Sequence, residues 1–232
     1  KKPVMVIPYS GTLFGITKAI REYLYKHDVD LPWEKDSFAH NYFLAKKIVQ
    51  TVKKVCPKSS IIMEYLTDIA KCYGNESKTI KWNTPSKFYV NQNYFIQNSK
   101  QIKTKIGIST VRLSLNEETD EVNSNKSTRS FAANFVHSLD AANVHLALEK
   151  SHKRGLKNFT TIHDCFGSTA ADIEEFISCV KQSFVEMYTS NVLDDLYGQS
   201  VIQLDKPQKL PTPPDLGDFN VCEVLDAPYV FS

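Results

Sequence analysis

Apolar residues recur three or four positions apart in four separate parts of the chain. A face repeated at this spacing predicts an amphipathic helix that packs on one side. The four segments are residues 43–55, 61–73, 134–153 and 173–187. Gly74 and Gly155 follow the second and third segments, and glycine commonly ends a helix. We expect the first two helices to pack together as an α-hairpin.

Two other stretches indicate strands. Residues 102–115 alternate apolar and polar side chains around Gly107 and precede a polar stretch at 116–130, which predicts a β-hairpin or bent ribbon followed by a loop. Residues 159–162 are aromatic or β-branched, and Phe166-Gly167 resumes the apolar pattern, with Asp164 between the two. Helices combined with small hairpins predict an α+β fold.

Composition is that of a soluble globular protein. The 232 residues are 42% hydrophobic and 23% charged, which suffices for one substantial domain or two smaller ones. No targeting segment or membrane-length apolar run is visible. The five cysteines are scattered and odd in number, without the CxxC spacing of a zinc site, so we expect reduced thiols.

Positive charge is concentrated in one part of the chain, although the net charge is only +2. Residues 40–112 hold thirteen lysines and arginines against three acidic residues. Aromatic residues such as Trp82 and Tyr94 are interleaved with these charges. Such a mixture fits contact with a phosphate backbone and stacked bases, and a lysine-rich solvated surface fits it equally well.

Asp164 is the main candidate for chemistry. A carboxylate held at the tip of a two-stranded hairpin is a suitable hard-oxygen ligand for Mg²⁺, and His163 beside it can point to the opposite face. An ordinary Asx turn is the alternative, because His-Asp dipeptides are common in loops. The residues around Asp164 alone favour the turn, because most His-Asp dipeptides in loops do no chemistry.

Four blocks of sequence, taken in order, favour a metal ligand at Asp164 over an ordinary Asx turn. They are residues 1–11, Trp82-Asn83-Thr84-Pro85 with Val90, Gln92 and Tyr94, the helix opening Asn134-Phe135-Val136-His137-Ser138-Leu139-Asp140, and the run 159–167. In this order they resemble the C-terminal part of the single-subunit DNA-directed RNA polymerases of the phage and mitochondrial type. The resemblance spans nearly the whole chain, and proline-containing forms of the first block resemble the branch carried on mitochondrial linear plasmids.

The resemblance implies part of a family A polymerase right hand. Residues 1–133 correspond to a helical fingers portion, and residues 134–232 to the C-terminal palm with a metal-binding β-hairpin and a short hydrophobic tail. Residues 97–128 are similar in position to the specificity loop that reads promoter DNA, with Lys103, Lys105 and Arg112 as contact candidates. A plain surface hairpin is the alternative for this segment.

The resemblance also implies a role for individual residues. Asp164 corresponds to the second metal-binding carboxylate and would ligate both Mg²⁺ ions, with His163 contacting the primer end. Lys1 corresponds to the lysine that offsets triphosphate charge and protonates the leaving pyrophosphate. Tyr9 corresponds to the tyrosine beside the ribose, and His137 to the histidine that hydrogen-bonds a 2′ hydroxyl or a group orienting Tyr9.

The implied reaction is Mg²⁺-dependent transfer of ribonucleotides to an RNA 3′ end on a DNA template. Its partners are template and promoter DNA, nascent RNA and ribonucleoside triphosphates, with no membrane. Two Mg²⁺ ions are expected in the complete enzyme. The family's first catalytic aspartate precedes the residue matched by Lys1, so we expect a truncated fragment that is inactive alone. A mitochondrial location is favoured, with a plastid or a phage-infected cell as alternatives.

Two prolines depart from the family pattern. Pro3 and Pro8 lie inside the segment that should be helical, which predicts a kink or an early stop before Tyr9.

Two other classes of protein stay open as interpretations. A family A DNA polymerase normally has glutamate directly after His-Asp, and Cys165 argues against it. A non-catalytic nucleic-acid-binding module is the third interpretation, supported by the missing carboxylate.

Overall fold

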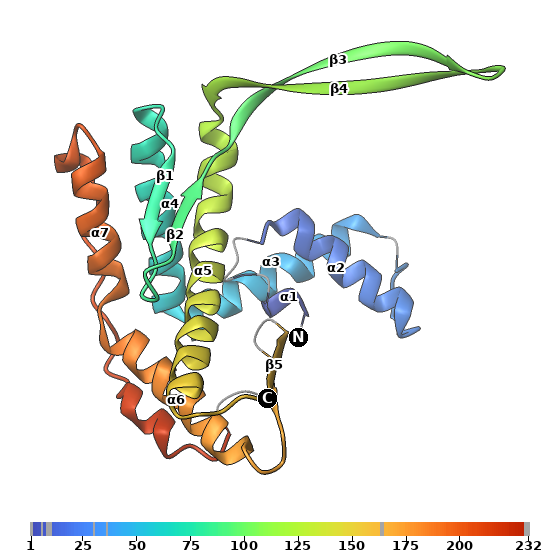
Figure 1. Cartoon of the computed structure of the whole chain (residues 1–232). Coiled ribbons are helices and arrows are strands. Elements are labelled where there is room, and N and C mark those ends of the chain that lie inside the picture. The colour runs from blue at the N-terminus through green and yellow to red at the C-terminus, as the bar shows by residue number, and fades with distance from the viewer. Residues whose placement is uncertain are drawn as a thin grey trace.

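The computed structural model of the chain describes residues 2–5, 7, 11–29, 31–35, 37–162 and 165–229. Within these ranges, helices are joined by three antiparallel hairpins of two strands each, which confirms the α+β class (Figure 1). In chain order the elements are α1 (Lys2–Met5), α2 (Leu13–Lys26), α3 (Phe38–Val55), α4 (Pro57–Asn75), β1 (Ile80–Asn83), β2 (Tyr89–Gln92), β3 (Phe95–Ile106), β4 (Ser109–Val122), α5 (Ser124–Lys153), β5 (Phe159–Ile162), β6 (Cys165–Ser168), α6 (Ile173–Thr189), α7 (Val192–Gln203) and the 3-10 helices η1 (Pro207–Lys209) and η2 (Val221–Leu225).

Helix α5 is the long central element on which the others are arranged (Figure 1). The Asn123 side chain starts it by accepting a hydrogen bond from the backbone N–H of Lys126, at 3.0 Å. Its end is set by Gly155, which has a φ of +84° that L side chains rarely adopt. The predicted end near residue 153 is therefore confirmed. The predicted start at Asn134 was wrong, because α5 begins ten residues earlier, at Ser124.

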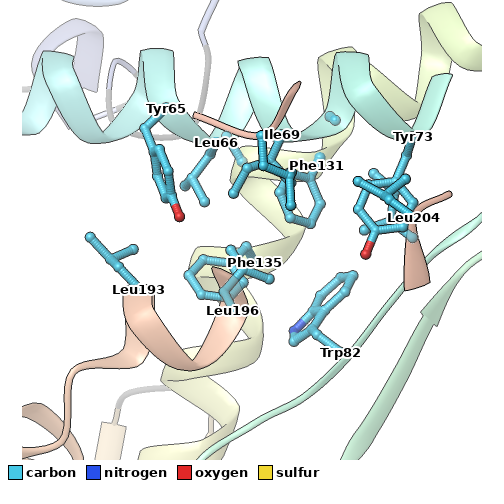
Figure 2. Packing of buried hydrophobic residues seen from close by; sticks show 14 of the residues in the cluster. Tyr65, Leu66, Ile69, Tyr73, Trp82, Phe131, Phe135, Leu193, Leu196 and Leu204 are labelled. Carbon is cyan, nitrogen blue, oxygen red and sulfur yellow. The ribbon is translucent and has the colours of Figure 1, made fainter. Parts of the chain in front are cut away.

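The main core lies between α4, α5, β1 and α7 (Figure 2). Trp82 of β1 is 1% exposed, and its ring meets that of Phe131 edge to face, with centroids 5.5 Å apart. Phe135, one turn further along α5, lies 6.1 Å from the same indole. Leucines of α7 and apolar residues of α4 close the cluster, and the labelled members are Tyr65, Leu66, Ile69, Tyr73, Leu193, Leu196 and Leu204. This core fixes the β1–β2 hairpin against α5.

Helix α7 also covers the outer edge of β1. Gln199 accepts a hydrogen bond from the backbone N–H of Asn83 at 2.6 Å and donates one to its carbonyl at 3.3 Å. Gln203 donates to the carbonyl of Lys81 at 2.8 Å. The two amides thus take the place of a third strand, which satisfies backbone groups that an edge strand leaves unpaired.

A second core lies under the β5–β6 hairpin, between the C-terminal half of α5 and α6. It buries Ala147, Leu156, Phe176, Cys179 and Val180. The predicted apolar face of α6 is confirmed at Phe176, Val180 and Met187, but Ile177 is 47% exposed. Helix α6 therefore faces α5 along a narrower stripe than the sequence indicated.

Helices α2 and α3 share a third core, which buries Ile16, Ile20, Leu24 and Ala45. The expected α-hairpin between α3 and α4 was wrong in its packing. The two helices follow each other directly at Cys56, but α4 buries its apolar face in the main core with α5 and α7. All five cysteines are free thiols.

Strands β3 and β4 form a long ribbon that extends away from the helices (Figure 1). The predicted β-hairpin at 102–115 is confirmed, with Gly107 in its turn at a φ of +62°. The predicted polar loop at 116–130 was wrong, because its first part continues β4 and its second part opens α5. Cross-strand bonds such as that from Thr119 Oγ1 to the Ile96 carbonyl, at 2.9 Å, hold this part of the ribbon without apolar burial.

The expected meeting point of fingers and palm portions, residues 133 and 134, falls inside α5. The division into these portions stays a prediction. Among the described residues, no helix combines the length and the apolar character needed to cross a membrane.

Candidate active site

The hairpin that the sequence predicted around Asp164 is present as β5–β6. Ile162 pairs with Cys165, and Phe159 pairs with Ser168, in an antiparallel ladder. The two residues between the strands are His163 and Asp164, which lie outside the described residues. A hairpin with this register therefore presents a histidine and a carboxylate as its connecting residues.

Aromatic packing fixes the base of this hairpin to α6. Phe159 stacks on Phe176, with ring centroids 5.8 Å apart, and Phe166 meets the same ring edge to face at 6.0 Å. Thr160 pairs with Gly167, where an added Cβ would come within 3.0 Å of the threonine methyl group. The hairpin thus has a rigid support, which suits a ligand that must be held in place.

His137 lies on α5, where its side chain is exposed. Its neighbours Phe135 and Leu139 are buried in the main core, so the helix turns His137 to the opposite, open side. Asp140 is also exposed, three residues further on. His137 therefore lies on the side of α5 that faces away from the main core.

Polar contacts join the β1–β2 hairpin to the helix on either side of His137. The Nε2 group of Gln92 donates to the carbonyl and the hydroxyl of Ser127, at 3.0 and 2.8 Å, and its Oε1 accepts from Asn134 Nδ2 at 2.8 Å. The indole N–H of Trp82 donates to Ser138 Oγ at 2.9 Å. The sequence analysis named Trp82 among the aromatic residues that could stack on bases, and this was wrong, because Trp82 is 1% exposed and lies in the main core. It placed Gln92, Asn134 and Ser138 in blocks that carry the resemblance but gave them no role, since nothing in their spacing shows that they meet.

Lys1 and Tyr9 lie outside the described residues. The helix before Tyr9 is short, as α1 ends at Met5, and this confirms the early stop expected from the two prolines. The next helix, α2, starts at Leu13, with Thr12 Oγ1 accepting a hydrogen bond from the Gly15 backbone N–H at 3.1 Å.

No group of three or more His, Cys, Asp or Glu side chains converges within the part of the chain that the structure describes. Asp164, with hard carboxylate oxygens, has the donor chemistry that Mg²⁺ prefers. It stays a predicted ligand.

The outer half of the β3–β4 ribbon carries positive charge on one of its two faces. Lys103 lies directly opposite Arg112, and Lys105 lies two residues along on the same face. Like charges opposite each other destabilise a bare hairpin, and an anion between them removes the repulsion. The other face holds Ile102, 39% exposed, and Ile106, 64% exposed.

Comparisons with known proteins show which family the chain resembles. A family model described as DNA-dependent RNA polymerase matches residues 1–206. The chain is 31% identical over 235 residues to DNA-directed RNA polymerase 2, chloroplastic/mitochondrial, of Arabidopsis thaliana, and 30% identical over 232 residues to DNA-directed RNA polymerase 1B, mitochondrial, of Nicotiana tabacum. Each match covers 100% of the chain and 22% of the relative.

A third relative is shorter. DNA-directed RNA polymerase 2A of Nicotiana tabacum is 29% identical over 233 residues, and the match covers 100% of the chain and 68% of that protein. The chain spans only 22% of the length of the first two relatives. The family model matches residues 1–206, which is most of this chain. The chain therefore belongs to the DNA-dependent RNA polymerase family.

Proposed function

We propose that the chain provides the nucleotide-adding part of a DNA-directed RNA polymerase. The reaction transfers a ribonucleotide from its triphosphate to an RNA 3′ end on a DNA template. The observation that carries the proposal is the register of β5–β6, which makes His163 and Asp164 the connecting residues of a rigidly supported hairpin in a chain of this family. The relatives named above are all RNA polymerases, which favours this class over a DNA polymerase.

Asp164 would hold Mg²⁺ through its carboxylate. Two bound ions would activate the 3′ hydroxyl and stabilise the charge of the leaving pyrophosphate. Lys1 would place a second positive charge on the triphosphate and deliver a proton to the leaving group. His163 would contact the primer end beside the carboxylate.

Tyr9 and His137 would select the sugar. An aromatic ring at Tyr9 offers a stacking surface for ribose and base, and the exposed imidazole of His137 offers a hydrogen bond to a 2′ hydroxyl. A site that hydrogen-bonds a hydroxyl rejects an analogue lacking it, because the polar group is then left unpaired. This pair would therefore favour ribonucleotides over deoxyribonucleotides.

The β3–β4 ribbon would contact nucleic acid. Its exposed basic face suits a phosphate backbone, and a two-stranded ribbon fits the major groove of DNA. We propose promoter and template DNA and nascent RNA as partners. An organelle is the proposed location, because the relatives are named mitochondrial or chloroplastic, with the mitochondrion preferred over the plastid.

The test is Asp164→Asn in a full-length polymerase that carries this chain at its matching position. Elongation from a primed template should be abolished, while template binding stays nearly intact. Asp218→Asn is the matched control, since it removes an exposed carboxylate from the segment between η1 and η2 and should leave elongation in place. Elongation by the Asp164 variant would refute its assignment, and preferential use of deoxyribonucleotides by the unaltered enzyme would refute the RNA polymerase class.

A further inference from the structure

The side-chain amide of Gln92 is buried, and its hydrogen bonds within the described part of the chain go to α5. Its side chain is 5% exposed, at the end of β2, and it binds α5 at Ser127 and at Asn134. These two positions are seven residues apart, about two helical turns. One amide therefore holds the helix at two points along its length.

Further contacts near Gln92 also fix α5. Asn134 Nδ2 also donates to the hydroxyl of Tyr94 at 3.2 Å, and the ammonium of Lys126 lies 4.6 Å from the centre of the Tyr94 ring. The bond from Trp82 to Ser138 adds a third point, four residues beyond Asn134. His137 lies between the last two points, so its direction follows the rotation of this part of α5.

Hydrogen bonds set the rotation of this part of α5 more sharply than apolar packing does. Burial of apolar surface has no preferred direction, whereas a hydrogen bond weakens steeply when its angle changes. A side chain extends about 6 Å from a helix axis, so a rotation of about 20° moves its tip by about 2 Å. In an active site, displacements of about 1 Å can lower the rate about 100-fold.

We propose that Gln92 is a positioning residue for sugar selection, which acts by fixing the rotation of α5 and hence the position of His137. This inference rests on the proposed function, in which His137 contacts the 2′ hydroxyl. Gln92 itself is buried under the helix and touches no substrate in this arrangement. Its effect reaches the nucleotide through Asn134 and the helix.

The test replaces Gln92 with methionine, which keeps the length of the side chain and removes every hydrogen bond. In the full-length polymerase that carries this chain, the ratio of kcat/KM for ATP to that for dATP should fall about tenfold or more. Ser183→Ala is the matched control. Ser183 lies on α6, is 0% exposed and donates a hydrogen bond to Asn143 at 3.0 Å. Asn143 lies in a different part of α5 from Asn134. The Ser183 variant should leave the ratio unchanged.

A double variant separates positioning from general weakening. In a His137→Ala background, Gln92→Met should have no further effect on the ratio, because the group that it positions is gone. Asn134→Ala is a second route to the same result, and alanine suits this half-buried position because it has the highest helix propensity. It should lower the ratio in the same direction as Gln92→Met.

The outcomes distinguish the inference from the proposed function. If His137→Ala lowers the ratio and neither Gln92→Met nor Asn134→Ala does, the inference is overturned and the function stands. A Gln92→Met effect that persists in full without His137 also overturns the inference. If the unaltered polymerase makes no RNA, the proposed function itself is wrong.

Discussion

Replacing Trp82 with phenylalanine tests how the main core is held together. Trp82 is 1% exposed and packs between Phe131 and Phe135 of α5. Its indole N–H donates to Ser138 Oγ. Phenylalanine keeps one aromatic ring at this position and removes both the donor and the second ring.

The expected loss of unfolding free energy is about 2 to 3 kcal/mol. The lost hydrogen bond to Ser138 accounts for about 1 kcal/mol. The smaller side chain accounts for about 1 to 2 kcal/mol, from the lost burial and the space left behind. A single domain is usually stable by about 5 to 15 kcal/mol, so a loss of this size is readily measured.

Urea unfolding followed by circular dichroism measures this difference. Trp33→Phe is the matched control, because it is the same substitution at the other tryptophan of the chain. Trp33 is half-buried, stacks on His40 and has no partner for its indole N–H among the described residues. We expect it to change the unfolding free energy by less than about 0.5 kcal/mol.

A double-mutant cycle with Ser138→Ala isolates the hydrogen bond. The coupling energy between Trp82 and Ser138 should be about 1 kcal/mol. Equal effects of the Trp82 and Trp33 substitutions would refute the reasoning. So would a coupling energy of zero, which would show that the indole N–H contributes nothing.

Three further changes test the ribbon, the backbone and a charged contact. Lys103→Ala should weaken DNA binding and lower the slope of log affinity against log salt by about one, measured by fluorescence anisotropy; an unchanged slope contradicts a phosphate contact. Gly155→Ala, at a φ of +84°, should cost about 1 to 2 kcal/mol in urea unfolding, whereas Gly198→Ala, inside α7, should gain about 0.5 to 1 kcal/mol; equal effects contradict a backbone origin. Hydrogen bonds from the backbone N–H of Asp205, from the side chain of Lys78 and from the backbone N–H of Lys206 hold the pKa of Glu76 below its ordinary value. Ionised Glu76 therefore stabilises the folded chain fully at pH values above its ordinary pKa. This stabilisation is lost as the pH falls through the lowered pKa. The melting temperature of Glu76→Gln should therefore lie below that of the unaltered chain at pH 7 and meet it in acid, and a constant difference contradicts this.

Segments that bury one face could be predicted from the sequence. The helix at 61–73 and the hairpin at 102–115 both show the required spacing, and both are present. The first ten residues of α5 could not be found this way. They are mostly polar, and one of their buried contacts is the Ser127 side chain, which is held by hydrogen bonds to Gln92.

The second half of β4 was missed for a related reason. Residues 116–122 are solvated on both faces for most of their length, so no apolar alternation marks them as a strand. Pairing with β3 holds them instead, as in the bond from Gln97 Nε2 to Glu118 at 3.1 Å. A strand stabilised by its partner leaves little trace in its own sequence.

The sequence by itself determined the hairpin that leaves His163 and Asp164 between its strands, because short apolar runs around a charged residue are a local pattern. It also carried the resemblance to RNA polymerases, which the family match confirmed. Only the tertiary structure brought Gln92 to Asn134, 42 residues away, and so joined the β1–β2 hairpin to the helix that bears His137. The reason is physical: apolar burial repeats with the period of its element, whereas a hydrogen bond between distant side chains has no period and exists only once the chain has folded.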